Sequence, residues 1–190
     1  MAFRWRNLGA LATCLVIAWL ALGPMPRIPG LAVADLGFAS LGHAAGEAVD
    51  AVLPAPVLPA AAGLLVPVAV PLALAGRFLR SWRERDAGAL CLAWAATVLT
   101  ALAVAADEAA EPGPASAGAP HDWAALLGPP GLRALDRTAD LVSALRGGAV
   151  VLLVVAAAVC AAPLVGAGLR AASAAEPRAS TWNGPNRRRV

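Results

Sequence analysis

The sequence predicts an all-α integral membrane protein with four transmembrane helices and short interfacial helices. Three observations lead to this fold class. Apolar residues make up 59% of the 190 residues and charged residues only 14%, whereas a typical soluble domain has about 25% charged residues. The apolar residues form uncharged runs close to the roughly 20 residues that a membrane-spanning helix needs. The charged residues gather in the segments between these runs.

The first predicted span covers residues 7–26, an uncharged run that follows Arg4 and Arg6. A cleaved signal peptide is the alternative, because Ala-Val-Ala at residues 32–34 is an A-x-A pattern. Three prolines separate this pattern from the apolar run, which leaves the candidate cleavage site unusually far from the apolar residues. We therefore expect an uncleaved helix.

Residues 27–56 form the first predicted extracytoplasmic segment. Proline and glycine dominate its start, and a helix is expected to begin at Asp35, which suits the N-cap position. Polar residues then recur on one face of this helix at helical spacing: Ser40, His43, Glu47 and Asp50. The pattern predicts a short amphipathic helix that lies at the membrane surface or dips into it.

Two further spans are predicted at residues 57–76 and 87–106. Pro67 and Pro71 lie four residues apart in the first of them and predict a kinked helix, because each removes one backbone donor. The turn between the two spans is rich in arginine and carries Arg77, Arg80, Arg83 and Arg85. We assign these arginines the role of setting the orientation of the chain in the membrane.

Residues 107–146 form the second predicted extracytoplasmic segment. It begins with Asp107 and Glu108 and continues as a linker of proline, glycine and small residues. His121-Asp122-Trp123 is expected to open a short helix. Asp122 is the expected N-cap and Trp123 is expected at the depth of the membrane interface.

The fourth predicted span covers residues 147–169 and continues an amphipathic helix that precedes it. It completes a single transmembrane domain over residues 1–169. The remaining residues 170–190 are polar and rich in arginine, and we expect them to form a disordered basic tail on the cytoplasmic side.

The distribution of charge predicts the orientation of the chain. With both termini on the cytoplasmic side of the plasma membrane, eleven of the 15 arginines but only three of the 12 acidic residues lie inside. Cytoplasmic loops carry such an excess of basic residues close to the spans. The net charge of +3 is therefore interpreted as a signature of membrane topology, and no nucleic-acid partner is expected.

The three cysteines, Cys14, Cys91 and Cys160, each lie inside a different apolar run. Cysteine in such a position usually acts as a small apolar residue. Disulfides form in oxidising aqueous compartments, and we expect none here. The chain has no C-x-x-C pair, which argues against a cysteine-based zinc or redox site.

Imidazole and carboxylate groups collect on the predicted outer side. His43 and Glu47 are four residues apart on one helix face, a spacing that can present two ligands to one metal ion. With Asp107 and His121 they form a candidate ligand set for zinc or another divalent cation. Glu108 and Asp122 are candidates for orienting a histidine ligand. The alternative is that these carboxylates are solvated or cap helices.

The stretch from Asp35 to Val49, the arginine-rich turn and the later His121-Asp122-Trp123 resemble a family of uncharacterised bacterial polytopic membrane proteins. Members of that family carry an H-E-x-G-H-like motif early and an H-D-W motif late. The resemblance implies a place for His43 in an intramembrane metalloprotease-like motif. This sequence departs from the motif, because Ala44 stands at the position of the general-base glutamate and Glu47 at that of the second histidine. The departure argues against hydrolysis.

Three classes of function fit these observations. The first is a small multi-pass membrane protein with a structural, assembly or partner-binding role and no catalysis. The second is a metal-binding, degenerate metalloprotease-like protein with its site at the outer membrane face. The third is a subunit of a transporter or channel, although the predicted spans lack the internal ionisable residues usual in ion pathways. The expected partners are the lipid bilayer and either a second copy or another membrane protein.

Overall fold

The computed structural model describes residues 2–22, 29–52, 55, 57–81, 83–110, 119–128 and 135–175. Every regular element in these ranges is helical, which confirms the all-α prediction. The elements are α1 (Ala2–Leu22), α2 (Pro29–Asp50), α3 (Leu58–Leu79), α4 (Arg85–Ala110), α5 (Ala119–Leu127), η1 (Leu135–Arg137) and α6 (Thr138–Ala175).

Three helices of the described part are long and apolar enough to cross a membrane. They are Leu58–Leu79, Arg85–Ala110 and Thr138–Leu169, which overlap the second, third and fourth predicted spans. The described side chains of α1 contribute a shorter apolar stretch, Trp5–Ala18. The structure therefore supports a multi-pass membrane protein with three candidate spans.

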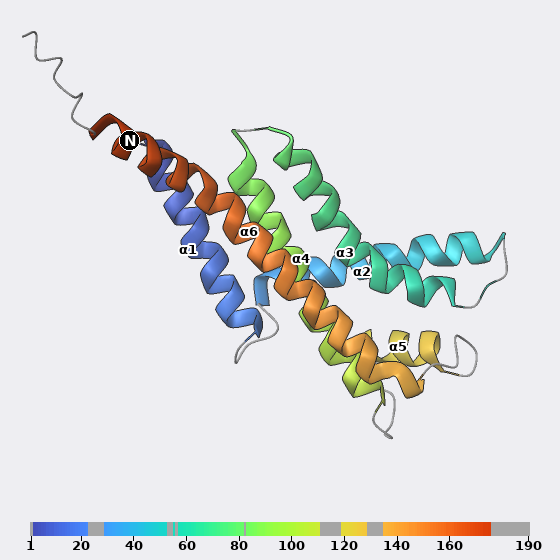
Figure 1. Ribbon diagram of the computed structural model, residues 1–190. Helices are drawn as coiled ribbons and strands as arrows, with labels where there is room; N and C mark the ends of the chain where they lie inside the picture. The colour runs from blue at the N-terminus through green and yellow to red at the C-terminus, as the bar shows by residue number, and fades with distance from the viewer. Residues whose placement is uncertain are drawn as a thin grey trace, which may run out of the picture.

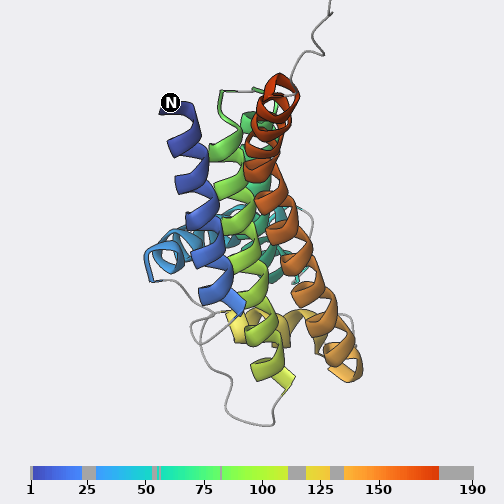
Figure 2. The same ribbon diagram turned by 60° about the vertical axis from the view of Figure 1, so that its left-hand side comes forward.

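Helix α4 lies at the centre of the molecule and contacts α1, α3, α5 and α6. Figures 1 and 2 show α1, α4 and α6 running side by side as a bundle. Small residues of α4 are completely buried, among them Ala89, Ala93 and Ala96. They allow close approach of the neighbouring helices, as small residues do in membrane bundles. Cys14 of α1 and Cys160 of α6 belong to the same buried cluster as these alanines.

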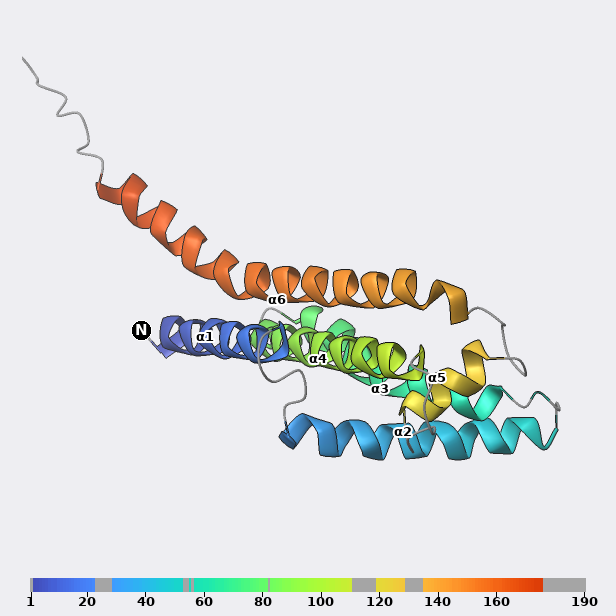
Figure 3. The same ribbon diagram turned by 90° about the horizontal axis from the view of Figure 1, so that it is seen from below.

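Helix α2 runs across this bundle at a steep angle and lies to one side of it (Figures 2 and 3). The first half of α3 (residues 58–66) follows α2, and its second half turns to run with α4, as Figure 1 shows. Pro67 and Pro71 lie inside this bent helix, and both are buried. The kink predicted from the two prolines is thus present. We call α2, α5 and the first half of α3 the lateral layer.

The contact between α2 and α3 depends on two glycines of α2, Gly42 and Gly46, which have no side chain to hold the helices apart. A Cβ atom added to Gly46 would stand 2.6 Å from the Cα atom of Pro59, and one added to Gly42 would clash with the carbonyl group of Ala62. Gly42 and Gly46 are four residues apart, which is the small-xxx-small spacing of closely packed membrane helices. These two glycines bring the backbones of α2 and α3 into direct contact.

Two helix boundaries differ from the predictions. Helix α2 begins at Pro29 instead of Asp35, because proline is well tolerated at the first position of a helix, where its missing N–H has no partner in any case. Asp35 therefore lies inside α2 and is not an N-cap. Helix α6 ends at Ala175, beyond the predicted end of the fourth span at residue 169. Residues 176–190 of the predicted tail lie outside the described residues.

The start of α1 and the turn between α3 and α4 lie at the same end of the bundle. The Arg6 Nη2 atom donates a hydrogen bond of 2.7 Å to the carbonyl oxygen of Arg83, and the Arg6 Nε atom lies 2.6 Å from the Asp86 Oδ2 atom. The C-terminal end of α6 points toward the same end of the molecule in Figures 1 and 2, and Figure 3 shows that it diverges from α1 there. We call Arg6 together with residues 77–81 and 83–86 the turn end.

Large apolar side chains remain exposed on the outside of the bundle. On α6 they include Val151, Val154 and Leu169, with exposed fractions of 60%, 62% and 67%. A soluble monomer rarely exposes a continuous apolar surface of this kind. The exposed face is therefore suited to lipid, in agreement with the candidate spans.

Candidate functional site

The early and late histidine-containing motifs meet in the lateral layer. The Nε2 atom of His43 on α2 lies 3.0 Å from the Oδ2 atom of Asp122 on α5, although 79 residues separate them in the sequence. The side chain of His43 is 35% exposed and that of Asp122 only 9%. The imidazole therefore closes over a nearly buried carboxylate, and the contact links α2 to α5.

Gly63 of α3 provides the space for the His43 ring. A Cβ atom at Gly63 would stand 2.5 Å from the His43 Nε2 atom, so any larger residue there would displace the ring. Gly63 is itself buried. The pair is thus assembled from three helices: α2 carries the imidazole, α5 carries the carboxylate and α3 leaves room for the imidazole ring.

Helix α5 is held in place by the residue that follows Asp122. Trp123 is 7% exposed, and its Nε1 atom donates a hydrogen bond of 3.1 Å to the Leu102 carbonyl oxygen of α4. Trp123 is therefore buried against α4, and its depth at the membrane interface stays a prediction. Asp122 is not the N-cap of its helix, because α5 begins at Ala119. Its carboxylate faces α2, where it accepts the contact with His43.

A second polar contact ties α2 to the central helix. The Trp94 Nε1 atom of α4 donates a hydrogen bond of 2.9 Å to the Asp35 Oδ1 atom. The Phe38 ring packs on the Trp94 ring with centroids 5.8 Å apart. Burial raises the pKa of the Asp35 carboxyl group, while the hydrogen bond from Trp94 acts in the opposite direction. This carboxylate is an interhelical acceptor beside the middle part of α4.

Two of the other predicted metal ligands, Glu47 and Asp107, form no metal-binding group with His43 among the described residues. Glu47, Asp107 and Glu108 are exposed, and Asp107 lies between α4 and α6. The side chain of His121 lies outside the described ones. Among the described residues, no three side chains of histidine, cysteine, aspartate or glutamate are placed to hold a metal ion together. The described side chains thus provide one His–Asp pair, which is fewer ligands than a protein metal site requires.

The four arginines assigned to topology lie around the turn between α3 and α4. Arg77 is in the last turn of α3, Arg80 and Arg83 follow it, and Arg85 begins α4. Arg77, Arg80 and Arg83 are exposed, and Arg85 is partly buried. Their positions put a concentrated positive charge at the turn end. The three cysteines are free thiols.

Sequence reasoning missed two features of this site. The Gly42–Gly46 spacing was a readable signal for close helix packing, and it explains how α2 reaches the face of α3 that carries Gly63. The Asp35–Trp94 hydrogen bond had no comparable signal, because 59 residues separate its partners. Both features place His43 where Asp122 can reach it.

Comparisons of this chain with known proteins found no match. No protein-family model matches the chain, and neither the curated proteins nor the solved structures yield a match.

Proposed function

We propose that the chain is a multi-pass plasma-membrane protein with a structural, partner-binding role, in which the lateral layer is the binding platform. The observation that carries this proposal is that polar side chains of the lateral layer bind side chains on other helices of the same chain. His43 contacts Asp122 and Asp35 accepts from Trp94, so these groups join helices of the same chain. A role in shaping the platform accounts for both contacts without a reaction.

The exposed face of α2 is the surface available to a partner. Leu36 and Leu41 are exposed by 68% and 63%, while the glycines on the opposite side of the helix contact α3. The partner is a second copy of this chain or another membrane protein, because an apolar surface beside candidate spans is suited to an apolar partner helix.

Site-specific photo-cross-linking in membranes tests this role. A photoreactive amino acid at Leu41 is expected to capture a protein and give a discrete band of higher mass. The same group at Val151 of α6, which is 60% exposed, serves as the matched control and is expected to capture lipid only. Lipid capture from both positions would contradict a partner at the lateral layer.

In this proposal α1 is an uncleaved fourth span and both termini are cytoplasmic. The packing of α1 against α4 and α6 and the joint position of Arg6 and the arginine-rich turn support it. Single cysteines at Glu84 and Glu108, in a chain whose native cysteines are replaced by alanine, test the orientation. A membrane-impermeant maleimide is expected to label the Glu108 position in intact cells and the Glu84 position only after lysis. The reverse pattern would overturn the orientation.

Metal binding is the second candidate function, favoured by one observation. The His43–Asp122 contact joins the two motifs that the family resemblance pairs, and a carboxylate that accepts from a ring nitrogen is a common way to orient a histidine ligand. The missing general base argues against metalloprotease activity in this alternative.

Elemental analysis of detergent-purified protein separates the two functions. If the platform is structural, the protein contains no stoichiometric zinc even after incubation with zinc and gel filtration. Stoichiometric metal that is lost in both His43→Ala and His121→Ala would replace the structural role with the metal-binding one. Glu108→Gln is the control for nonspecific binding by exposed carboxylates.

A further inference from the structure

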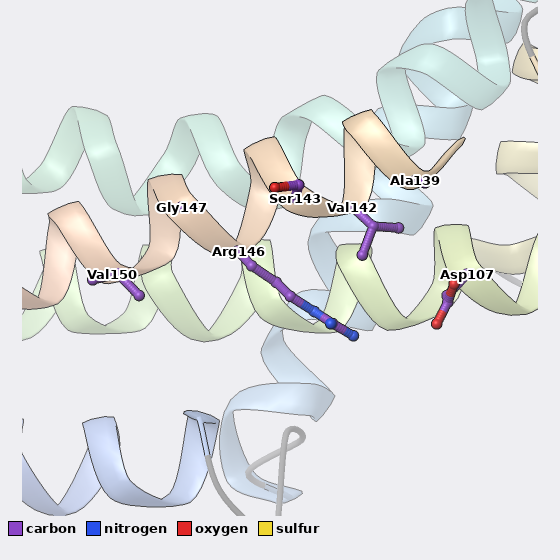
Figure 4. Close-up of a pocket in the computed structure, with 7 residues that line it drawn as sticks. All are labelled: Asp107, Ala139, Val142, Ser143, Arg146, Gly147 and Val150. Carbon is purple, nitrogen blue, oxygen red and sulfur yellow. The ribbon is translucent and has the colours of Figure 1, made fainter. Parts of the chain in front are cut away.

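A groove lies apart from the His43–Asp122 pair, between α4 and α6. It is an open groove of about 510 Å³ near the end of α4 (Figure 4). Asp107 of α4 forms one side of it. Residues of α6 form the rest: Ala139, Val142, Ser143, Arg146, Gly147 and Val150.

The groove carries one positive and one negative side chain. Arg146 and Asp107 are both exposed. In Figure 4 the Arg146 side chain extends from α6 across α4, and the Asp107 carboxylate lies on the side toward which it reaches. Guanidinium groups bind phosphate oxygens well, and a carboxylate accepts hydrogen bonds from a primary ammonium group. A molecule with both a phosphate and an ammonium group therefore matches the groove.

The apolar part of the groove leads onto the lipid-facing side of α6. Val150 lines the groove and is 44% exposed. Val151 and Val154 follow it on the exposed face of the same candidate span. Gly147 leaves open space in the groove, because a Cβ atom there would meet nothing within 4 Å. A ligand with its polar group at Arg146 can thus lay an acyl chain along α6.

We propose that this groove binds the headgroup of a phospholipid with a primary ammonium group, phosphatidylethanolamine. Arg146 binds the phosphodiester, Asp107 accepts from the ammonium group, and the valine face of α6 contacts an acyl chain. Phosphatidylglycerol lacks the ammonium group, and phosphatidylcholine has an ammonium group without N–H donors. The groove therefore discriminates among three abundant lipid classes by its two charges.

Native mass spectrometry of the full-length protein in detergent tests this site. With equal concentrations of the three lipids added, the wild-type protein is expected to retain one phosphatidylethanolamine in preference to the other two. Arg146→Ala is expected to lower this occupancy roughly fivefold or more, as loss of a charge-assisted contact implies. Asp107→Asn is expected to keep a bound lipid but to lose the preference for phosphatidylethanolamine over phosphatidylglycerol.

Gly147→Leu places a side chain at the groove, and its Cβ atom would meet nothing within 4 Å. It is expected to melt close to the wild-type temperature and to retain no phosphatidylethanolamine. The matched controls are Glu108→Gln and Arg137→Ala, which change exposed charges outside the groove and are expected to bind as the wild type does. Equal retention of the three lipids by the wild type, or wild-type retention by Gly147→Leu, would overturn the proposal. Neither outcome bears on cross-linking at Leu41, so the two proposals fail separately.

Discussion

The lateral layer and the turn end both join helices through polar contacts, but they do so in different surroundings. At the turn end, the side chains of Arg6 and Asp86 are 50% and 16% exposed. In the lateral layer, the side chains of His43 and Asp122 are 35% and 9% exposed, so each partner is less exposed than its counterpart at the turn end. An exposed pair exchanges contacts with water for a contact of similar strength, whereas a buried group that loses its partner stays unsatisfied. The comparison teaches that stability should depend on the lateral layer much more than on the turn end.

The largest effect is expected at Gly46, where packing leaves no room for a side chain. Gly46→Leu must separate α2 from α3, because the new Cβ atom would stand 2.6 Å from the Pro59 Cα atom. We expect a loss of about 3 kcal/mol or more in the free energy of unfolding. A thiol-reactive dye in a thermal melt measures it, because Cys14 and Cys160 are buried in the folded protein.

Gly37 on the same helix is the matched control for this substitution. A Cβ atom there would meet nothing within 4 Å, so Gly37→Leu is expected to be neutral or to stabilise the helix slightly through better helix propensity. Equal melting temperatures for the two variants would show that α2 does not pack on α3 as described.

The next effect is expected at the His43–Asp122 contact. Asp122→Ala should cost about 2 kcal/mol, because it removes the partner of His43 and empties a buried site. A double-mutant cycle with His43→Ala should give a coupling energy of about 1 kcal/mol. Glu47→Ala changes an exposed carboxylate one turn away and should lie within about 0.5 kcal/mol of the wild type. A coupling energy near zero would mean that the contact does not hold α2 to α5.

A smaller, pH-dependent effect is expected at Asp35. Burial raises the pKa of this group in the folded state, so the protonated form favours folding. Its contribution is fully present below the unfolded pKa and is lost as the pH rises through the raised folded pKa. Asp35→Asn keeps an acceptor for Trp94 and should remove this part of the pH dependence. Melting curves recorded from mildly acidic to neutral pH measure it, and an unchanged slope in the variant would argue against the buried position of Asp35.

The smallest effect is expected at the turn end. Arg6→Ala removes the contact with Asp86 but should cost no more than about 1 kcal/mol, and the cost should fall as salt is added. The same thermal melt at low and high ionic strength measures both. A cost equal to that of Asp122→Ala would break the comparison between the two regions.

The spans were predictable because they depend on a one-dimensional property. Uncharged runs of sufficient length indicated the positions of α3, α4 and α6, and two prolines indicated the change of direction in α3. The start of α2 was predicted wrongly, because Pro29 was interpreted as part of an irregular connection although proline also suits the first position of a helix.

The candidate site was only partly predictable, because it depends on which helices meet. The sequence indicated His43 as a candidate ligand and Asp122 as a candidate for orienting a histidine, but it did not indicate that Asp122 contacts His43 across 79 residues. Asp122 was expected to cap its own helix, and local capping signals cannot reveal a partner on a distant helix. Asp107 was assigned to the same metal site, whereas it lines the groove with Arg146.

The crossing of α2 over the bundle has a consequence for how the protein is made. Helix α2 is synthesised before α3, α4 and α5, yet its contacts through Gly46, Asp35 and His43 are with those three later helices. A nascent chain that has not reached residue 122 therefore cannot close the lateral layer, whatever has already entered the membrane. During translation the glycine face of α2 can pack on α3 as soon as α3 follows, but His43 has no Asp122 until α5 is made, and in this interval a chaperone or an early partner would have access to His43.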